Sequence, residues 1–209
     1  YVADFDSRHV FRVSVPRGSK FEGAVVVRIF LPLSFLSTMT LLLVMVLGLS
    51  IDDPKVVSRA VQAGVQYHVL TALAALMFTL LVHAIVLTYF MGTGRWIEET
   101  STAYKLDPSL YHQSKTIKYR TIPAMVACMV LLILTAALGA AADPGATLQS
   151  RGYLGYSAAT IHLSVAIVTV LANVAMNYAE FRALERNTEI IGQVLSEVRR
   201  IRQEKGLAV

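Results

Sequence analysis

Residues 66–91 read QYHVLTALAALMFTLLVHAIVLTYFM, a stretch of 26 residues without a single Asp, Glu, Lys or Arg. Because an α-helix rises about 1.5 Å per residue, this stretch is long enough to cross the roughly 30 Å hydrocarbon layer of a membrane. Small and polar residues recur in it at spacings of 4, 3, 4 and 4, which places them on one helical face: His68, Ala72, Ala75, Thr79 and His83. We therefore expect this face to pack against protein and the leucine-rich remainder to contact lipid.

The composition extends this interpretation to the whole chain. Of 209 residues, 55% are hydrophobic and only 16% are charged, whereas soluble proteins average about 25% charged residues. The net charge of +5 would suit a nucleic acid partner, but the basic residues lie beside apolar stretches, where they report membrane orientation and attract anionic lipid. The composition thus predicts an all-α polytopic membrane protein and no nucleic acid partner.

The apolar stretches are expected to form a four-helix transmembrane bundle within a membrane domain of residues 24–179. A polar arm (1–23) precedes this domain, and an amphipathic helical tail (180–209) follows it. We expect two short amphipathic helices in the connections, one capped by Asp53 and one beginning at Asp107 and Pro108. The expected spans are residues 25–51, 66–91, 122–142 and 158–178.

The distribution of positive charge predicts the orientation. Sixteen of the 19 Lys and Arg residues lie in the N-terminal segment, the second connection and the tail, all on one side of a four-span bundle. By the positive-inside rule both termini are expected in the cytoplasm. The compact connections favour a bacterial inner membrane as the location.

An internal repeat is a further prediction. The first and third spans both end in a Leu-Gly pair, at Gly48 and Gly139, and each has a proline sixteen residues earlier, Pro32 and Pro123. The fourth span also repeats the spacing of the second span, with His162, Ala166, Thr169, Asn173 and Asn177. We interpret this pattern as a tandem repeat of a helical hairpin. Chance similarity between apolar helices remains the alternative.

Two histidines are candidates for cofactor binding. His68 and His162 each lie about one turn below the outer end of their span, and facing alanines would leave room for a flat group. Two neutral imidazoles there could ligate haem b, although a hydrogen-bonded pair without any cofactor is the first expectation. The remaining polar side chains of these spans are expected to pack by hydrogen bonds inside the bundle: His83, Thr79, Thr169, Asn173 and Asn177.

The tail carries a broad apolar stripe that needs a partner. It can lie against the connecting helices of the same chain or on the lipid surface, or it can dock another subunit. The residues assigned to docking are Leu184, Ile191, Leu195, Val198 and Ile201.

Reactive groups are scarce in this sequence. We expect no acidic side chain within any span, no metal-ligand cluster and no nucleophile with its base, and we interpret Cys128 as a small buried apolar residue. An enzyme is therefore not expected. The leading hypothesis is a non-catalytic integral membrane subunit that scaffolds or docks a larger assembly, with lipids and other membrane subunits or further copies of the chain as partners. The alternative is a small haem b cytochrome that exchanges electrons with a quinone through His68 and His162.

Overall fold

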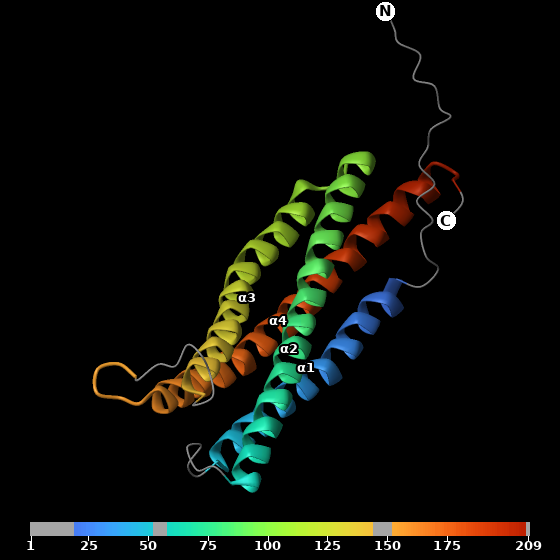
Figure 1. Cartoon of the computed structure of the whole chain (residues 1–209). Helices are drawn as coiled ribbons and strands as arrows, with labels where there is room; N and C mark the ends of the chain where they lie inside the picture. Colours follow the sequence, from blue (N-terminus) through green and yellow to red (C-terminus); the bar gives the residue numbers. More distant parts are fainter. Residues whose placement is uncertain (1–18, 52–57, 144–151, 208–209) are drawn as a thin grey trace, which may run out of the picture.

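The computed structural model describes residues 19–51, 58–143 and 152–207, with side chains from residue 26 onward, and these residues form four long helices (Figure 1). Each helix is long and apolar enough to cross a membrane. The prediction of an all-α, four-helix transmembrane bundle is thereby confirmed. The helices are α1 (Ser19–Leu49), α2 (Arg59–Tyr104), α3 (Pro108–Ala142) and α4 (Ala158–Glu204).

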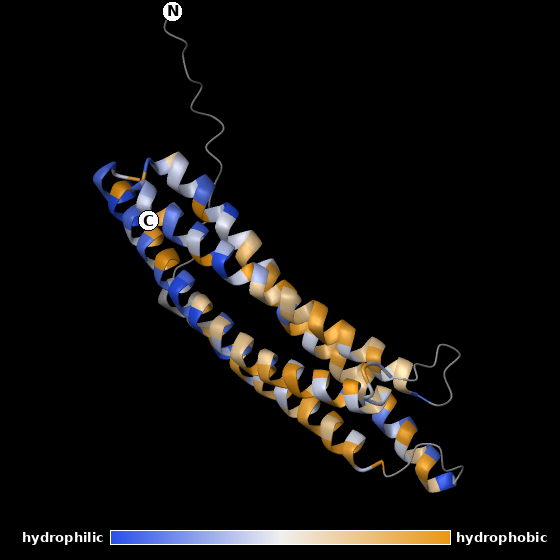
Figure 2. Cartoon of the chain, turned by 90° about the vertical axis from the view of Figure 1, so that its left-hand side faces the viewer, coloured by the Kyte–Doolittle hydropathy of each residue, from blue (hydrophilic) through white to orange (hydrophobic). Residues whose placement is uncertain are grey.

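The helices form an antiparallel bundle in chain order. Each helix packs against the next, and α4 closes the bundle against α1. Across the diagonals the backbones of α2 and α4 approach each other, whereas no Cα atoms of the described parts of α1 and α3 lie within 8 Å of each other. The start of α1 and the end of α4 therefore face the same end of the molecule, and Figure 2 shows that this end is hydrophilic while the opposite part is largely apolar. Side chains from α2 and α4 consequently meet in the interior.

Helix α2 continues far beyond the apolar stretch that predicted it. The second span was expected to end at Met91, but the helix runs through Gly92 and Gly94 to Tyr104. A glycine costs only about 1 kcal/mol relative to alanine inside a helix, and the fully buried Ile97 one turn further on offsets this cost by packing against α4. The expectation that the second span ends at Met91 and leads into a connection was therefore wrong, because this part of the connection is helical to Tyr104.

A tight turn joins α2 to α3. Lys105 adopts a left-handed conformation (φ 52°), and its backbone N–H donates to the carbonyl groups at the end of α2. The side chain of Asp107 then accepts a hydrogen bond from the backbone N–H of Ser109, which also lowers the pKa of Asp107. The short helix expected at Asp107 and Pro108 begins where predicted, but it continues without a break into the third span.

The beginning of α2 also differs from the expectation. Ser58 is its N-cap, and the hydroxyl of Ser58 accepts a hydrogen bond from the backbone N–H of Val61. A serine in this position satisfies one of the free N–H groups of the first turn. Asp53, the expected cap of a short connecting helix, lies outside the described residues.

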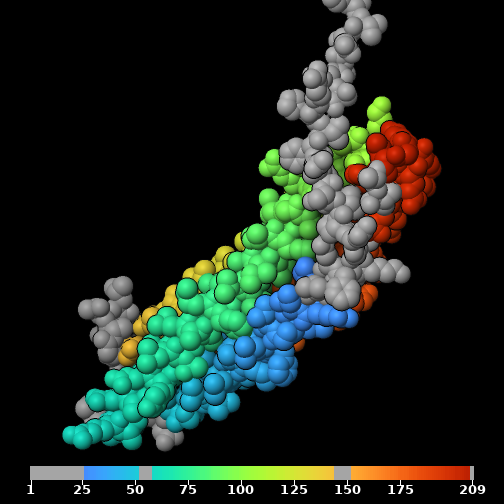
Figure 3. All heavy atoms as spheres, turned by 90° about the vertical axis from the view of Figure 1, so that its right-hand side faces the viewer, coloured from blue at the N-terminus to red at the C-terminus, as the bar shows by residue number. Residues whose placement is uncertain are grey.

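Beyond the apolar segments, α2, α3 and α4 continue as a three-helix extension, which we define as residues 92–120 and 181–204. In Figure 3, α1 runs beside α2 only over the lower part of the molecule, while α2 and α4 continue past it. The extension has a hydrophobic core of its own, made by Ile97, Leu106, Leu110, Ile190, Val194 and Val198. It is thus built as a small helical unit rather than a single projecting tail.

This core corrects our assignment of the apolar stripe of α4 to another subunit. Leu184, Leu195 and Val198 are buried within the chain, while Ile191 and Ile201 are half-buried and pack against the core of the extension. The periodicity indicated correctly that the stripe needs cover, but α2 and α3 of the same chain provide it. These five side chains therefore do not form a free docking surface.

Candidate functional site

His83 lies at the centre of a polar cluster inside the bundle. Its Nδ1 is 2.7 Å from Oε1 of Glu180 on α4, and its Nε2 is 3.0 Å from Oδ1 of Asn173 on the same helix. The thiol of Cys128 on α3 lies 4.0 Å from the same Nε2. His83, Asn173 and Glu180 expose none of their surface and Cys128 exposes 5%. We call these four residues the imidazole cluster.

The geometry limits how protons are arranged in the imidazole cluster. Both ring nitrogens of His83 face oxygen atoms, so an imidazolium can donate to an ionised Glu180 and to the amide oxygen of Asn173. Alternatively, a protonated Glu180 donates to Nδ1 while Nε2–H donates to Asn173. The two arrangements differ only in the position of one proton. Both are neutral overall, as a site without access to water requires, because an unpaired buried charge costs several kcal/mol.

The imidazole cluster has hydrogen-bonding capacity left over. Oε2 of Glu180 and Nδ2 of Asn173 are buried without a partner among the described residues. Buried polar atoms in proteins are normally paired, and each unpaired atom costs about 1–3 kcal/mol. The cluster can therefore accept and donate further hydrogen bonds without displacing the contact between His83 and Glu180.

Glu180 contradicts our expectation that no acidic side chain lies among the spanning segments. The fourth span was expected to end at Tyr178 because the hydropathy falls there, which placed Glu180 in the tail. The sequence did contain a pattern that indicates burial of Glu180: Asn173, Glu180 and Asn187 are seven residues apart and therefore fall on one helical face. In the structure all three are fully buried. Asn187 bonds to Ser114 on α3 (2.9 Å) and to Thr93 on α2 (3.0 Å).

The other polar residues singled out in the spans also link helices. Thr79 accepts a hydrogen bond from Ser37 of α1 at 3.0 Å. The hydroxyl groups of Thr135 and Thr169 are 2.6 Å apart and join α3 to α4. The amide of Asn177 donates to Thr38 of α1 at 3.2 Å, which joins α4 to α1. These bonds join α1 to α2, α3 to α4 and α4 to α1. The remaining neighbours, α2 and α3, are bridged by Cys128 of the imidazole cluster and by the contacts of Asn187.

The structure also brings His68 and His162 together in the part of the bundle opposite the three-helix extension. Their ring centroids are 6.3 Å apart and the ring planes are inclined by 77°. Nδ1 of His68 is 3.1 Å from the carbonyl oxygen of Val44, which leaves Nε2 of a neutral ring as an acceptor. Both rings are half-buried. The pair therefore lies at one depth, as the sequence indicated.

Each of these two rings lies directly on a glycine. A Cβ added to Gly48 of α1 would lie 2.9 Å from Cε1 of His68, and a Cβ added to Gly139 of α3 would lie 2.9 Å from Cε1 of His162. Any larger residue would force the rings to move. The two glycines of the predicted repeat thus have the same physical role, which is to let an imidazole approach the backbone of the preceding helix.

Comparison with known proteins adds no family assignment. No protein-family model matches this chain, and neither the curated proteins nor the solved structures give a match. Within the described residues, no three His, Cys, Asp or Glu side chains come together in a group that could hold a metal ion.

Removing either member of the His83–Glu180 pair should strongly destabilise the bundle. We expect His83→Ala and Glu180→Ala each to lower the free energy of unfolding by about 3–5 kcal/mol, because the remaining group is left buried and unpaired. The double variant should cost clearly less than the sum of the single variants. Unfolding in mixed detergent micelles, followed by circular dichroism, measures all three.

Glu185→Ala is the matched control on the same helix. Glu185 pairs with Arg182 at 2.8 Å, but this pair is partly exposed, so its loss should cost less than about 1 kcal/mol. Strictly additive costs for His83→Ala and Glu180→Ala would show that the two side chains do not interact.

Proposed function

We propose that this chain is a non-catalytic integral membrane subunit that holds its three-helix extension at the membrane surface as a docking platform for a larger assembly. The observation that supports this proposal is continuity: α2, α3 and α4 pass from their apolar segments into the extension without a break. An unbroken helix is stiff, and three such helices packed around a common core cannot swing independently of the membrane. The extension thus keeps a fixed distance from the membrane and a fixed orientation relative to it.

A fixed platform favours binding because less freedom is lost when the partner docks. Ordering a loop or a side chain at an interface costs about 0.5–1.5 kcal/mol per immobilised group, and a preorganised surface avoids much of this cost. The extension meets this requirement because Ile97 and Val194, at its centre, are completely buried. The partner would bind the outer surface, since the apolar stripe of α4 is already covered.

The outer surface of the extension carries charges of both signs. Arg95 pairs with Glu99 on α2, and Arg200 pairs with both Glu197 and Glu204 on α4. Exposed pairs of this kind contribute little to stability, but they give the platform a defined charge pattern that a partner can match. We therefore infer a polar, charge-complementary interface.

The positive-inside count supports a cytoplasmic location for this platform, because the second connection and the tail together hold eleven of the 19 Lys and Arg residues. A bacterial inner membrane remains our proposal for the location. The tandem hairpin also remains a prediction, supported by the equivalent contacts of Gly48 with His68 and of Gly139 with His162.

Charge exchange on the platform tests this proposal without disturbing its core. In native gels of membranes extracted with a mild detergent, the unaltered chain should migrate within a complex larger than itself. The double variants Arg95→Glu/Glu99→Arg and Arg200→Glu/Glu204→Arg keep an ion pair and the net charge but reverse the local polarity, and at least one of them should release the chain from the complex.

Arg59→Glu, at the exposed outer start of α2, is the control and should leave the complex intact. An unaltered chain that migrates alone, or a complex that survives both exchanges, would rule out the docking platform.

A second candidate is the haem b cytochrome, which is favoured by one observation, the 6.3 Å separation of the His68 and His162 rings. A metal bonded to imidazole nitrogen on each side at about 2 Å, together with the half-width of each ring, gives a separation of this order. The carbonyl of Val44, at 3.1 Å from Nδ1, would orient His68 as such carbonyls orient metal-bound histidines. This candidate ranks second because an edge-to-face pair of free imidazoles has the same separation.

A visible absorption spectrum separates the two candidates. If the chain binds haem b, the purified protein should show a Soret band that disappears in His68→Ala and in His162→Ala but persists in His112→Ala. A spectrum without this band, from protein produced with ample haem, excludes the cytochrome.

A further inference from the structure

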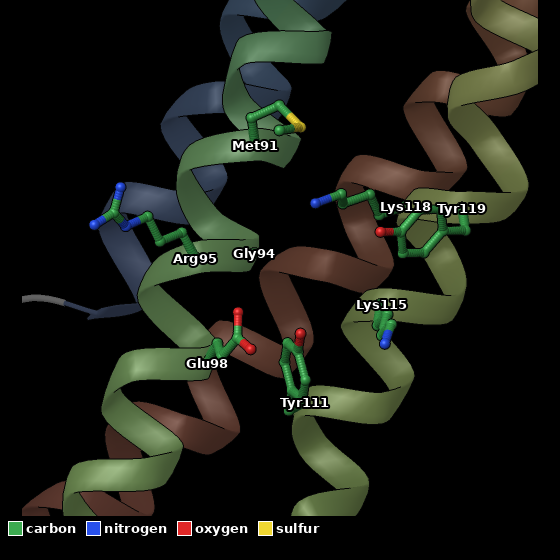
Figure 4. A pocket seen from close by; sticks show the side chains of 8 residues that line it. All are labelled: Met91, Gly94, Arg95, Glu98, Tyr111, Lys115, Lys118 and Tyr119. Carbon is green, nitrogen blue, oxygen red and sulfur yellow. The ribbon is translucent and has the colours of Figure 1, made fainter.

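A pocket of about 250 Å³ opens between α2 and α3 where the extension leaves the apolar part of the bundle (Figure 4). Four of its lining residues come from α2 and four from α3. They are Met91, Gly94, Arg95, Glu98, Tyr111, Lys115, Lys118 and Tyr119.

The depth of this pocket corresponds to the boundary between acyl chains and headgroups. Met91 is the last residue of the apolar stretch 66–91 and is 52% exposed. On the other wall, Lys118 lies one helical turn before the apolar stretch of α3, and the neighbouring Tyr119 is 62% exposed. Exposed tyrosines and lysines next to apolar segments are typical of membrane interfaces. One edge of the pocket therefore meets lipid and the other meets water.

Two cations of this pocket have no carboxylate partner. Lys118 Nζ lies 5.5 Å from the ring centroid of Tyr119, and Lys115 Nζ lies 5.9 Å from that of Tyr111, but neither lysine forms an ion pair with a described residue. Arg95 is different, because it pairs with Glu99 at 2.8 Å and points away from α3 in Figure 4. Basic pockets between helices at this depth are suited to the phosphate of a lipid headgroup.

Gly94 lines the pocket on the side of α2. A Cβ added there would lie at ordinary contact distance from Lys118, 3.7 Å from Cδ and 3.9 Å from Nζ, and Figure 4 shows this lysine reaching from α3 toward α2. A large side chain at Gly94 would occupy the pocket without removing any charge. Gly92, half a turn away, has no atom within 4 Å of its Cβ position and does not line the pocket.

The opposite end of the pocket has a different chemistry. Glu98 and Tyr111 face each other in Figure 4, further from Met91 than Lys118 is, and the interaction with Glu98 raises the pKa of Tyr111. A carboxylate would repel a phosphate, but it accepts hydrogen bonds from a hydroxyl or an ammonium group. Along the pocket, the cation Lys118 therefore lies nearest the apolar segments and the acceptor Glu98 lies further into the extension. A phospholipid headgroup has the same order, with the phosphate next to the acyl chains and the polar terminus beyond it.

We propose that this pocket binds the headgroup of a glycerophospholipid, with the phosphate on Lys118 and Lys115 and a hydroxyl or ammonium donor of the headgroup on Glu98. The acyl chains would then lie along the exposed side of Met91. A phosphatidylcholine headgroup has the same phosphate but a quaternary ammonium without a donor, so it should bind more weakly than phosphatidylglycerol or phosphatidylethanolamine.

Native mass spectrometry of the full-length, delipidated chain tests the proposal. After titration with each lipid, one phosphatidylglycerol or phosphatidylethanolamine per chain should be retained in preference to phosphatidylcholine. Lys118→Gln should weaken this binding about five-fold, as expected for one cation at a membrane surface. Glu98→Ala should remove the preference for ethanolamine over choline.

A substitution that fills the pocket without changing any charge distinguishes specific binding in the pocket from general attraction of lipids to positive charge. Gly94→Leu keeps every charge but should abolish the preferential binding, whereas Gly92→Leu and the charge control Arg186→Gln should leave it unchanged.

A second experiment adds inorganic phosphate or glycerol phosphate to the protein in phosphatidylcholine micelles and measures thermal stability. If these compounds stabilise the protein and Gly94→Leu removes the effect, the same phosphate site belongs to a soluble ligand. Equal retention of all lipids with no protection by phosphate, or binding that Gly94→Leu does not change, would overturn the proposal.

Discussion

The contact between His83 and Glu180 joins the two longest helices of the bundle at a place that water does not reach. Apolar surfaces gain little by packing together in a membrane, because lipid tails are as apolar as leucine side chains, so polar contacts and small residues decide how the helices meet. The pair as a whole carries no net charge, and each side chain is the hydrogen-bond partner of the other. Sliding α4 by a single turn would separate them and leave two buried polar side chains unpaired. The pair thereby fixes the register of α2 against α4, and the bonds of Thr79, Thr169 and Asn177 fix the outer helices around it.

This register has consequences at both ends of the molecule. At the end opposite the extension it brings His68 and His162 to the same level, where each ring fits only because Gly48 and Gly139 lack side chains. Toward the other end the same helices continue into the extension. There Asn187 links α2, α3 and α4, and beyond it the three helices are held together by the hydrophobic core of the extension. One alignment of two helices therefore sets the geometry of the histidine pair and the direction of the proposed platform.

The sequence predicted those features that depend on length and periodicity. Hydrophobic length identified four spans, and the spacing of small and polar residues identified the interior faces of α2 and α4, including His83 and Asn173. Other features depend on tertiary contacts that periodicity does not encode. Gly92 and Gly94 weaken a helix locally, and the packing of Ile97 against α4 stabilises the helix beyond them. Hydropathy ends the fourth span at Tyr178, so Glu180 was assigned to the tail although its seven-residue spacing from Asn173 and Asn187 places it inside. An apolar stripe shows that cover is needed, but not that α2 and α3 of the same chain provide it.

Solid-state nuclear magnetic resonance of the chain in lipid bilayers tests the central pair most directly. With ¹⁵N-labelled histidine and ¹³C-labelled glutamate, we predict a through-space correlation between Nδ1 of His83 and the side-chain carboxyl carbon of Glu180, absent in Glu180→Leu, and no exchange of the imidazole protons with water on the timescale of the experiment. A spectrum in which this correlation is missing and the His83 ring exchanges its protons as rapidly as that of the exposed His112 would contradict the account.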